Sequence, residues 1–237
     1  MNRQLATTTP LREETHRGRA TKAVIFDRDG VLSRFDLQAA AAFFRPLIPL
    51  SIEALLEAWL SWQRRHGLPR DLQQERALQT GFWRHLAGQL DLSLDRRRRL
   101  ERFEYTSVIR PFPEVRTTLA ALRRRGLRCG VFSNFSLASI DASLEAAGLA
   151  DLIDVACAGP VVGAMKPEPA AYRIVMEALA VAPAECLLFD DERINVEAAR
   201  ALGIRAYWVD RSRTEDVPGE GVVCSLSGCL ALLDGER

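Results

Sequence analysis

Two close pairs of acidic side chains in this sequence each directly follow a short apolar run. Asp27 and Asp29 follow one run, and Asp190 and Asp191 follow another. Carboxylates this close repel each other unless a cation neutralises part of their charge, and oxygen ligands on short turns suit Mg²⁺. A carboxylate can also attack phosphorus and form an aspartyl-phosphate. The pairs therefore point to metal-assisted phosphoryl chemistry, although Asp-x-Asp-Gly also suits a tight turn and acidic pairs also favour helix N-termini.

A hydroxyl, an amide and a lysine occur at comparable positions. Ser133 and Asn134 follow a third apolar run, and Lys166 lies beside a proline in the segment "MKPEP". Only Lys22 and Lys166 are lysines among the 32 basic residues. Hydroxyls, ammonium groups and backbone amides are the donors that a transferring phosphoryl group requires. We therefore predict that Ser133, Asn134 and Lys166 bind phosphate.

The elements that must position these residues alternate between strand and helix. Apolar runs predict buried strands, which we expect at residues 23–26, 128–132, 153–157, 186–189 and 205–209. Helical patterns lie between these runs, and such alternation predicts a parallel sheet with helices on both faces. Ligands bind outside the carboxyl ends of parallel strands, so the polar residues should meet at one edge. The predicted fold class is α/β.

A long helical stretch interrupts this alternation after the first strand. Apolar residues recur at spacings of three and four behind Ser51, which suits a helix N-cap. We predict a helical domain at residues 35–108, inserted into an α/β core formed by residues 21–34 and 109–237. Residues 1–20 show no apolar periodicity and are expected to form a flexible tail.

Four segments resemble, in order, the four motifs of the haloacid dehalogenase-like (HAD) hydrolase superfamily. They read "VIFDRDGVL", "VFSN", "MKPEP" and "LLFDDERINVEAARALGI". The resemblance extends over roughly residues 22–210 and implies a Rossmann-like sheet core. The helical insert resembles the C1-type cap of that superfamily, and Mg²⁺ is the implied cofactor.

The resemblance also implies a role for each motif residue. Asp27 matches the nucleophile and Mg²⁺ ligand, and Asp29 matches the general acid and base, with its carbonyl on the metal. Ser133 and Lys166 match the phosphoryl-binding pair. Asp191 matches a further metal ligand, and Asp190 is a possible one. Asn195 stands where many members of the superfamily carry another aspartate, which makes this site one charge less acidic.

Asp29 also distinguishes between the reactions of the superfamily. A halide leaves without a proton, whereas the alkoxide of a phosphate ester needs one, so Asp29 favours ester hydrolysis. We expect a phosphatase that acts on a small phosphorylated metabolite, such as a sugar phosphate, phosphoglycolate or a nucleotide. Two alternatives remain: a phosphomutase of the same fold, and a non-catalytic binding or regulatory protein.

Composition limits the classes of partner. The 237 residues carry 32 basic and 31 acidic side chains, so a general affinity for nucleic acid or for an anionic membrane is not expected. Five cysteines without a close Cys-x-x-Cys pair indicate reduced thiols, and we expect a cytoplasmic protein. Walker A, G-x-S-x-G and H-E-x-x-H motifs are absent. The oligomeric state is not predicted.

Overall fold

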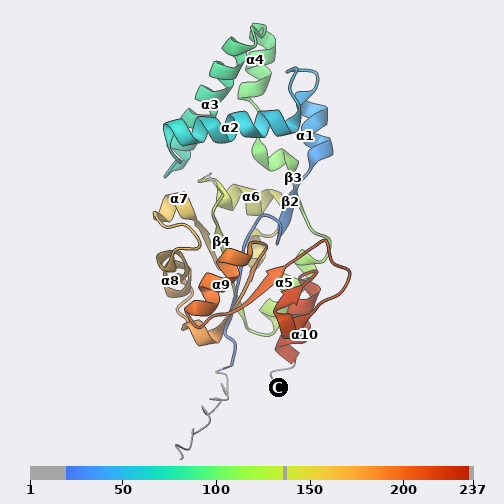
Figure 1. Ribbon diagram of the computed structural model, residues 1–237, viewed down its shortest axis with the longest axis vertical. Helices are drawn as coiled ribbons and strands as arrows, with labels where there is room; N and C mark the ends of the chain where they lie inside the picture. The colour runs from blue at the N-terminus through green and yellow to red at the C-terminus, as the bar shows by residue number, and fades with distance from the viewer. Residues whose placement is uncertain (1–19, 136–137, 235–237) are drawn as a thin grey trace, which may run out of the picture.

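The computed structural model describes residues 20–135 and 138–234, so the tail expected at 1–20 lies outside the described residues except for its last one. Within the described residues, six parallel strands form one sheet in the order β5-β4-β1-β6-β7-β8 (Figure 1). These strands are β1 (Ala23–Phe26), β4 (Arg128–Ser133), β5 (Val155–Ala158), β6 (Cys186–Asp190), β7 (Arg205–Val209) and β8 (Val222–Val223). The predicted α/β fold with a parallel sheet is confirmed.

The strand β1 lies in the middle of the sheet, between β4 and β6. Phe26 lies opposite Val131 on one side and Phe189 on the other, and all four β1 residues are buried. A strand covered on both faces needs apolar side chains on both, which explains the continuous apolar run in the sequence.

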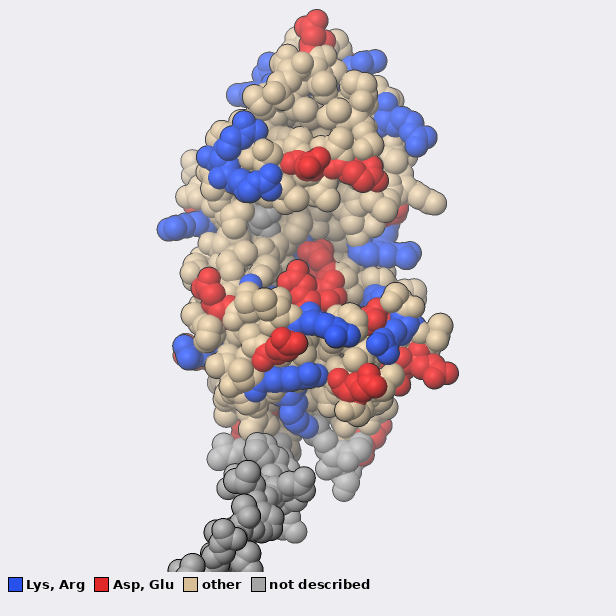
Figure 2. Space-filling view, in the orientation of Figure 1, with Lys and Arg blue, Asp and Glu red and all other residues tan. Residues whose placement is uncertain are grey.

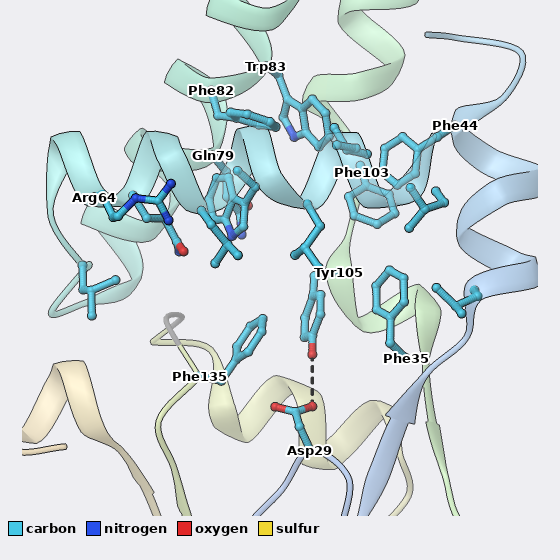
Figure 3. Close-up of a pocket in the computed structure, with 18 of the residues that line it drawn as sticks. Asp29, Phe35, Phe44, Arg64, Gln79, Phe82, Trp83, Phe103, Tyr105 and Phe135 are labelled. Atoms are coloured by element: carbon cyan, nitrogen blue, oxygen red, sulfur yellow. Dashed lines mark hydrogen bonds between the residues drawn. The ribbon is translucent and has the colours of Figure 1, made fainter. Parts of the chain in front are cut away.

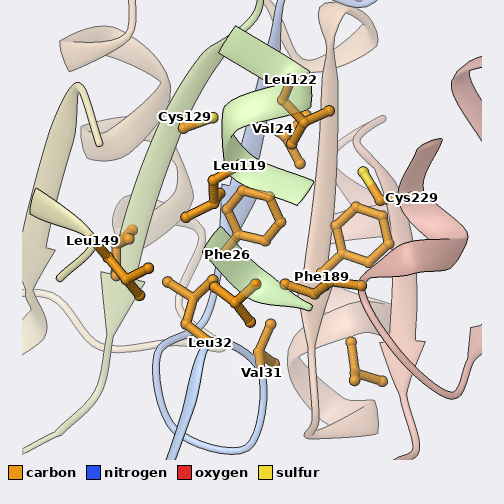
Figure 4. Packing of buried hydrophobic residues seen from close by; sticks show 14 of the residues in the cluster. Val24, Phe26, Val31, Leu32, Leu119, Leu122, Cys129, Leu149, Phe189 and Cys229 are labelled. Carbon is orange, nitrogen blue, oxygen red and sulfur yellow. The ribbon is translucent and has the colours of Figure 1, made fainter. Parts of the chain in front are cut away.

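Helices cover both faces of this sheet. They are α5 (Val115–Arg124) and α10 (Ser227–Asp234) on one face, and α8 (Pro169–Ala178) and α9 (Arg193–Ala201) on the other. On the first face Phe26 and Phe189 stack at 5.8 Å between ring centroids, beside Leu119 and Leu122 of α5 (Figure 4). Both faces are therefore closed by packing, and the ends of the strands remain for chemistry.

Several short elements lie in the connections. They are α6 (Ile140–Ala146), α7 (Gly159–Val162) and the 3₁₀ helices η1 (Tyr105–Val108), η2 (Ala150–Leu152), η3 (Pro183–Glu185) and η4 (Pro218–Glu220). None of the described helices has the length and apolar character needed to cross a membrane.

Four helices form a layer beyond the carboxyl ends of the strands (Figure 1). This helical layer consists of α1 (Leu37–Phe44), α2 (Ile52–His66), α3 (Leu72–Gln89) and α4 (Leu94–Glu101). A side-chain oxygen caps the N-terminus of each helix, as when Ser51 accepts the Ala54 N–H at 3.2 Å. The layer has an apolar core of its own, which includes Phe44, Phe82 and Trp83.

A two-stranded antiparallel ribbon joins the helical layer to the sheet. It pairs β2 (Ser33–Phe35) with β3 (Ile109–Pro111), and Ser33 lies opposite Pro111. The chain therefore enters and leaves the helical layer at neighbouring points.

Candidate active site

A buried lysine joins two of the predicted carboxylates at the ends of β1 and β6. Lys166 Nζ donates to Asp27 Oδ1 at 2.7 Å and to Asp190 Oδ2 at 2.6 Å. The Lys166 and Asp190 side chains are only 2% and 1% exposed. Burial raises the pKa of Asp27 to about 7, and the neighbouring Asp190 adds to this rise while Lys166 opposes it. The ammonium group thus holds the predicted nucleophile at a fixed position.

Asp190 and Asp191 have different surroundings. Both Asp190 oxygens are used within the protein, because Oδ2 binds Lys166 and Oδ1 accepts the Glu192 N–H at 2.9 Å and the Asn195 Nδ2–H at 3.0 Å. Asp191 is exposed at the surface of the same turn. Asp190 therefore orients Lys166 and the turn, and the Asp191 carboxylate is the accessible member of the pair.

Ser133 at the end of β4 and Asn134 directly after it, both predicted to bind phosphate, make contacts within the protein. Asn134 Nδ2 donates to the Lys166 carbonyl at 2.6 Å, and the Lys166 N–H donates to Asn134 Oδ1 at 2.8 Å. The Ser133 hydroxyl oxygen accepts the Phe135 N–H at 3.0 Å. Asn134 thus fixes the backbone of the lysine loop, and this contact makes it a positioning residue for Lys166.

The side chain of Asp29 is held by two residues that have no predicted role. Arg28 Nη2 donates to Asp29 Oδ2 at 2.7 Å and to the Tyr105 hydroxyl at 3.1 Å, and that hydroxyl donates to Asp29 Oδ1 at 3.5 Å. Arg28 is 3% exposed and also binds the Ser143 hydroxyl at 3.1 Å. The Arg28 guanidinium lies 4.4 Å from the centre of the Phe135 ring. Asp29 is therefore contacted by Arg28, from the turn after β1, and by Tyr105 of η1, while Ser143 of α6 holds Arg28.

Nothing in the sequence marks Tyr105 or Ser143 for this role. Tyr105 lies in η1, and Ser143 lies in α6, so each is far along the chain from Asp29. Only the packing of η1 and α6 over the end of β1 brings them together. Burial raises the pKa of Tyr105 above its ordinary value, so its hydroxyl stays protonated and can donate.

Gly30 gives Asp191 its place beside the turn after β1. Gly30 has a φ of +75°, and a Cβ added there would lie 2.1 Å from Asp191 Oδ2. The Asp191 carboxylate therefore occupies the space that any other residue at position 30 would fill. Although Asp191 is exposed as a residue, its carboxylate lies against Gly30, and this partial loss of water together with the neighbouring Asp190 raises the pKa of Asp191 to about 6.

The donor set expected for Mg²⁺ consists of Asp27, Asp191 and the Asp29 carbonyl. In the part of the chain that the structure describes, no three His, Cys, Asp or Glu side chains gather closely enough to hold an ion without other ligands. Burial is the main cause of the raised pKa values of Asp27 and Asp191, and the neighbouring Asp190 carboxylate adds to both. Oxygen-only donors of excess negative charge fit a Mg²⁺ that keeps water and substrate oxygens as its remaining ligands.

A cavity of about 900 Å³ opens between this sheet edge and the helical layer (Figure 3). We call it the interlayer cavity. Asp29 lies on its sheet side, with Tyr105 and Phe135 next to it. Its wall is formed by Asp29, Phe35, Leu37, Phe44, Ile52, Leu55, Leu56, Trp59, Leu60, Gln63, Arg64, Leu68, Gln79, Phe82, Trp83, Phe103, Tyr105, Asn134 and Phe135. Acidic side chains also gather just below the helical layer on the face shown in Figure 2.

A family model described as haloacid dehalogenase-like hydrolase matches residues 21–203. The chain belongs to the haloacid dehalogenase-like hydrolases. The matched region begins just before β1 and ends just after α9, so it includes the sheet edge and the helical layer.

Similar proteins within this family carry out more than one reaction. Phosphatase MT3486 of Mycobacterium tuberculosis (strain CDC 1551 / Oshkosh) is 42% identical over 215 residues, 90% of this chain and 97% of that protein. The (S)-2-haloacid dehalogenase of Pseudomonas sp. (strain YL) is 28% identical over 196 residues, 81% of this chain and 83% of that protein. The crystal structure of the L-2-haloacid dehalogenase RSc1362 aligns with a TM-score of 0.65 at 26% identity, over 91% of this chain and 100% of that one. The chain is therefore a HAD-like hydrolase, and the proteins similar to it include both a phosphatase and dehalogenases.

Proposed function

We propose that this HAD-like hydrolase is a phosphatase that cleaves phosphate monoesters through an aspartyl-phosphate on Asp27. The observation that carries the proposal is Asp29, a carboxylate two residues from the nucleophile, held by Arg28 and Tyr105 and facing the interlayer cavity. Hydrolysis of an ester needs a proton donor for the leaving alkoxide, and release of a halide does not. The 42% identical relative is called a phosphatase, which agrees with this choice.

The first half of the reaction transfers the phosphoryl group to the protein. An Asp27 carboxylate oxygen attacks phosphorus, the bond between phosphorus and the ester oxygen breaks, and Asp29 gives its proton to the leaving alkoxide. Lys166 orients the Asp27 carboxylate for attack on phosphorus and stabilises negative charge on the phosphoryl oxygens. In the second half, Asp29 takes a proton from water, which attacks phosphorus and releases Asp27 and inorganic phosphate.

Magnesium fits the same edge. We propose that Asp27, Asp191 and the Asp29 carbonyl bind Mg²⁺, which when bound would neutralise charge on the carboxylates and phosphoryl oxygens. Gly30 keeps the place of Asp191 open for this purpose. The helical layer would act as a C1-type cap that limits the access of water and selects the leaving group.

The first test compares two leaving groups in one protein. Release of phosphate from phenyl phosphate and of chloride from 2-chloropropionate is measured with Mg²⁺ and with chelator, for wild type, Asp27→Asn and Asp95→Asn. Asp95, in the first turn of α4, lies outside the site and serves as the control. We expect phosphate release that requires Mg²⁺ and is lost only in Asp27→Asn. Chloride release without phosphate release would overturn the proposal in favour of a dehalogenase.

A second measurement addresses the phosphomutase alternative. A mutase returns the phosphoryl group to a second hydroxyl of its sugar, so product analysis of a sugar monophosphate with a bisphosphate activator separates the two reactions. A phosphatase yields inorganic phosphate and free sugar, whereas an isomeric sugar phosphate would favour the mutase.

A further inference from the structure

The interlayer cavity differs from the surroundings that a sugar or a nucleotide needs. We infer that the leaving group of the natural substrate is a bulky apolar alcohol or phenol, which occupies the cavity while its phosphate lies at Asp27. This inference rests on the proposed phosphatase function and narrows its substrate class. At about 900 Å³ the cavity is within the range of roughly 300–1,000 Å³ usual for sites that bind small organic ligands.

Exposed apolar side chains are concentrated on the cavity wall. Among the described residues, large apolar side chains that remain exposed include five that line the cavity, namely Phe35, Leu37, Leu56, Leu60 and Leu68. A contiguous patch of exposed apolar side chains is typical of a ligand-binding or interaction site. Leu56 and Leu60 lie one helical turn apart on α2, so they present one continuous apolar strip to the cavity. An apolar ligand would remove this strip from water.

Several polar groups of the wall are already used within the protein. Gln79 Nε2 donates to Glu75 Oε1 at 3.2 Å, and the Asn134 amide binds the backbone of Lys166 through both its oxygen and its nitrogen. The Tyr105 hydroxyl is shared between Arg28 and Asp29. The hydroxyls of a sugar placed here would lose water without gaining equivalent partners, and such unpaired polar groups weaken binding.

The charges of the wall fit a substrate with a single phosphate. Among the described residues that line the cavity, Asp29 is the acidic one and Arg64 is the basic one. Arg64 is exposed at the end of α2, and Figure 3 shows it at the opposite side of the cavity from Phe44. A second phosphate or a polyphosphate chain usually requires a cluster of cations, which these lining residues do not supply. The wall therefore suits a hydrocarbon or aromatic group.

A homologous series of esters tests this substrate class. Initial rates are measured with Mg²⁺ for ethyl, butyl, hexyl and octyl phosphate below their micellar concentrations, for phenyl and 1-naphthyl phosphate, and for glycerol 3-phosphate and glucose 6-phosphate. Each buried methylene contributes up to about fourfold in kcat/KM, so we expect at least about a tenfold rise from ethyl to octyl. The alkyl and aryl arms show which form of apolar group fits better.

Two exposed leucines provide a matched pair of variants. Leu56 is 54% exposed and lines the cavity, whereas Leu72 is 53% exposed and does not. Leu56→Gln should lower kcat/KM for octyl phosphate about fivefold and leave that for ethyl phosphate nearly unchanged. Leu72→Gln should change neither. Equal effects of the two variants, or a preference for the polyol phosphates, would overturn the inference.

Failure of the inference differs from failure of the proposed function. Release of phosphate mainly from polyol esters overturns the apolar substrate class and leaves the phosphatase in place. If no ester is cleaved, the phosphatase proposal fails. The apolar character of the ligand is then tested by binding of octyl phosphate alone. Trp59 and Trp83 line the cavity, so octyl phosphate should change tryptophan fluorescence saturably in wild type and in Leu72→Gln, and more weakly in Leu56→Gln. Absence of a saturable change would then overturn it.

Discussion

Replacement of Gly30 by alanine tests the placement of the metal ligands. A Cβ at position 30 would lie 2.1 Å from Asp191 Oδ2 and 2.6 Å from its Cγ, well inside van der Waals contact. The carboxylate of Asp191 must therefore move in Gly30→Ala. Because Asp191 is exposed, it can swing toward solvent without repacking the core. The fold should survive while the oxygen donor leaves its place.

The size of the effect has two parts. The φ of +75° at Gly30 costs an alanine about 1–2 kcal/mol, whatever lies around it. Displacement of a ligand or of its support typically weakens metal binding by about 10–100-fold. Gly126 distinguishes the backbone cost from the loss of metal affinity, because its φ is +77° and a Cβ there would meet nothing within 4 Å. Gly126→Ala should show the backbone cost alone.

The assay combines melting temperature with a Mg²⁺ titration of phosphate release. Both variants should lose stability by a similar amount, with about 2–4 °C in Tm for each kcal/mol in a chain of this size. Only Gly30→Ala should need more Mg²⁺ for half-maximal activity, by about 10–100-fold. An unchanged Mg²⁺ requirement in a folded Gly30→Ala protein would refute Asp191 as a ligand.

Three further predictions follow from the site and the core. Asp29→Asn should lower turnover of an alkyl phosphate by about 10²–10⁴-fold and that of p-nitrophenyl phosphate much less, because nitrophenolate leaves without a proton; equal losses would contradict the acid role. Lys166→Met should lower the free energy of unfolding by about 3–5 kcal/mol in urea titrations, because it leaves buried carboxylates without a cation. Lys22→Met removes an ion pair whose lysine side chain is 57% exposed and should cost about 0–1 kcal/mol, so similar losses in the two variants would contradict a stabilising role for the buried contacts of Lys166 with Asp27 and Asp190. Burial raises the pKa of Cys129 to about 12, so at about pH 8 roughly one Cys129 thiol in 10⁴ is ionised. Iodoacetamide should therefore label the half-buried Cys224 before Cys129. Mass spectrometry that shows the reverse order of labelling would disprove this prediction.

Much of the sheet edge was predictable because buried parallel strands have a simple sequence pattern. The short apolar runs before Asp27 and Asp190 are typical of strands covered on both faces, and the rule for strand ends then places those carboxylates together. The 2.6–2.7 Å contacts of Lys166 agree with that placement. The apolar pattern alone does not separate Asp190 from Asp191. The family resemblance favours Asp191 as the metal ligand, whereas the hydrogen bonds of Asp190 are visible only in the structure.

The groups around Asp29 were not predictable in the same way. Tyr105 contacts Asp29, and Ser143 contacts Arg28, through packing between segments that are distant in sequence, and a lone tyrosine or serine has no pattern. The sequence does not predict the ribbon of β2 and β3, because a strand of three residues is too short for a period of two to be visible. In addition, β3 contains Pro111. Short, long-range pairings of this kind depend on the rest of the fold.

This ribbon has a consequence for how such a chain can be rebuilt. Phe35 lies opposite Ile109, so the two ends of the helical segment are fixed at the spacing of a single strand pair. A tight two-residue turn spans the same gap, which makes the intervening helices exchangeable as a unit for another insert or for a hairpin loop. The strand order of the sheet depends on contacts of β1 with β4 and β6, and none of these strands belongs to the helical segment. Under the proposed function, an exchanged insert would change leaving-group selection while the sheet edge keeps the phosphoryl chemistry, and the new insert would have to retain the contact that Tyr105 makes with Asp29.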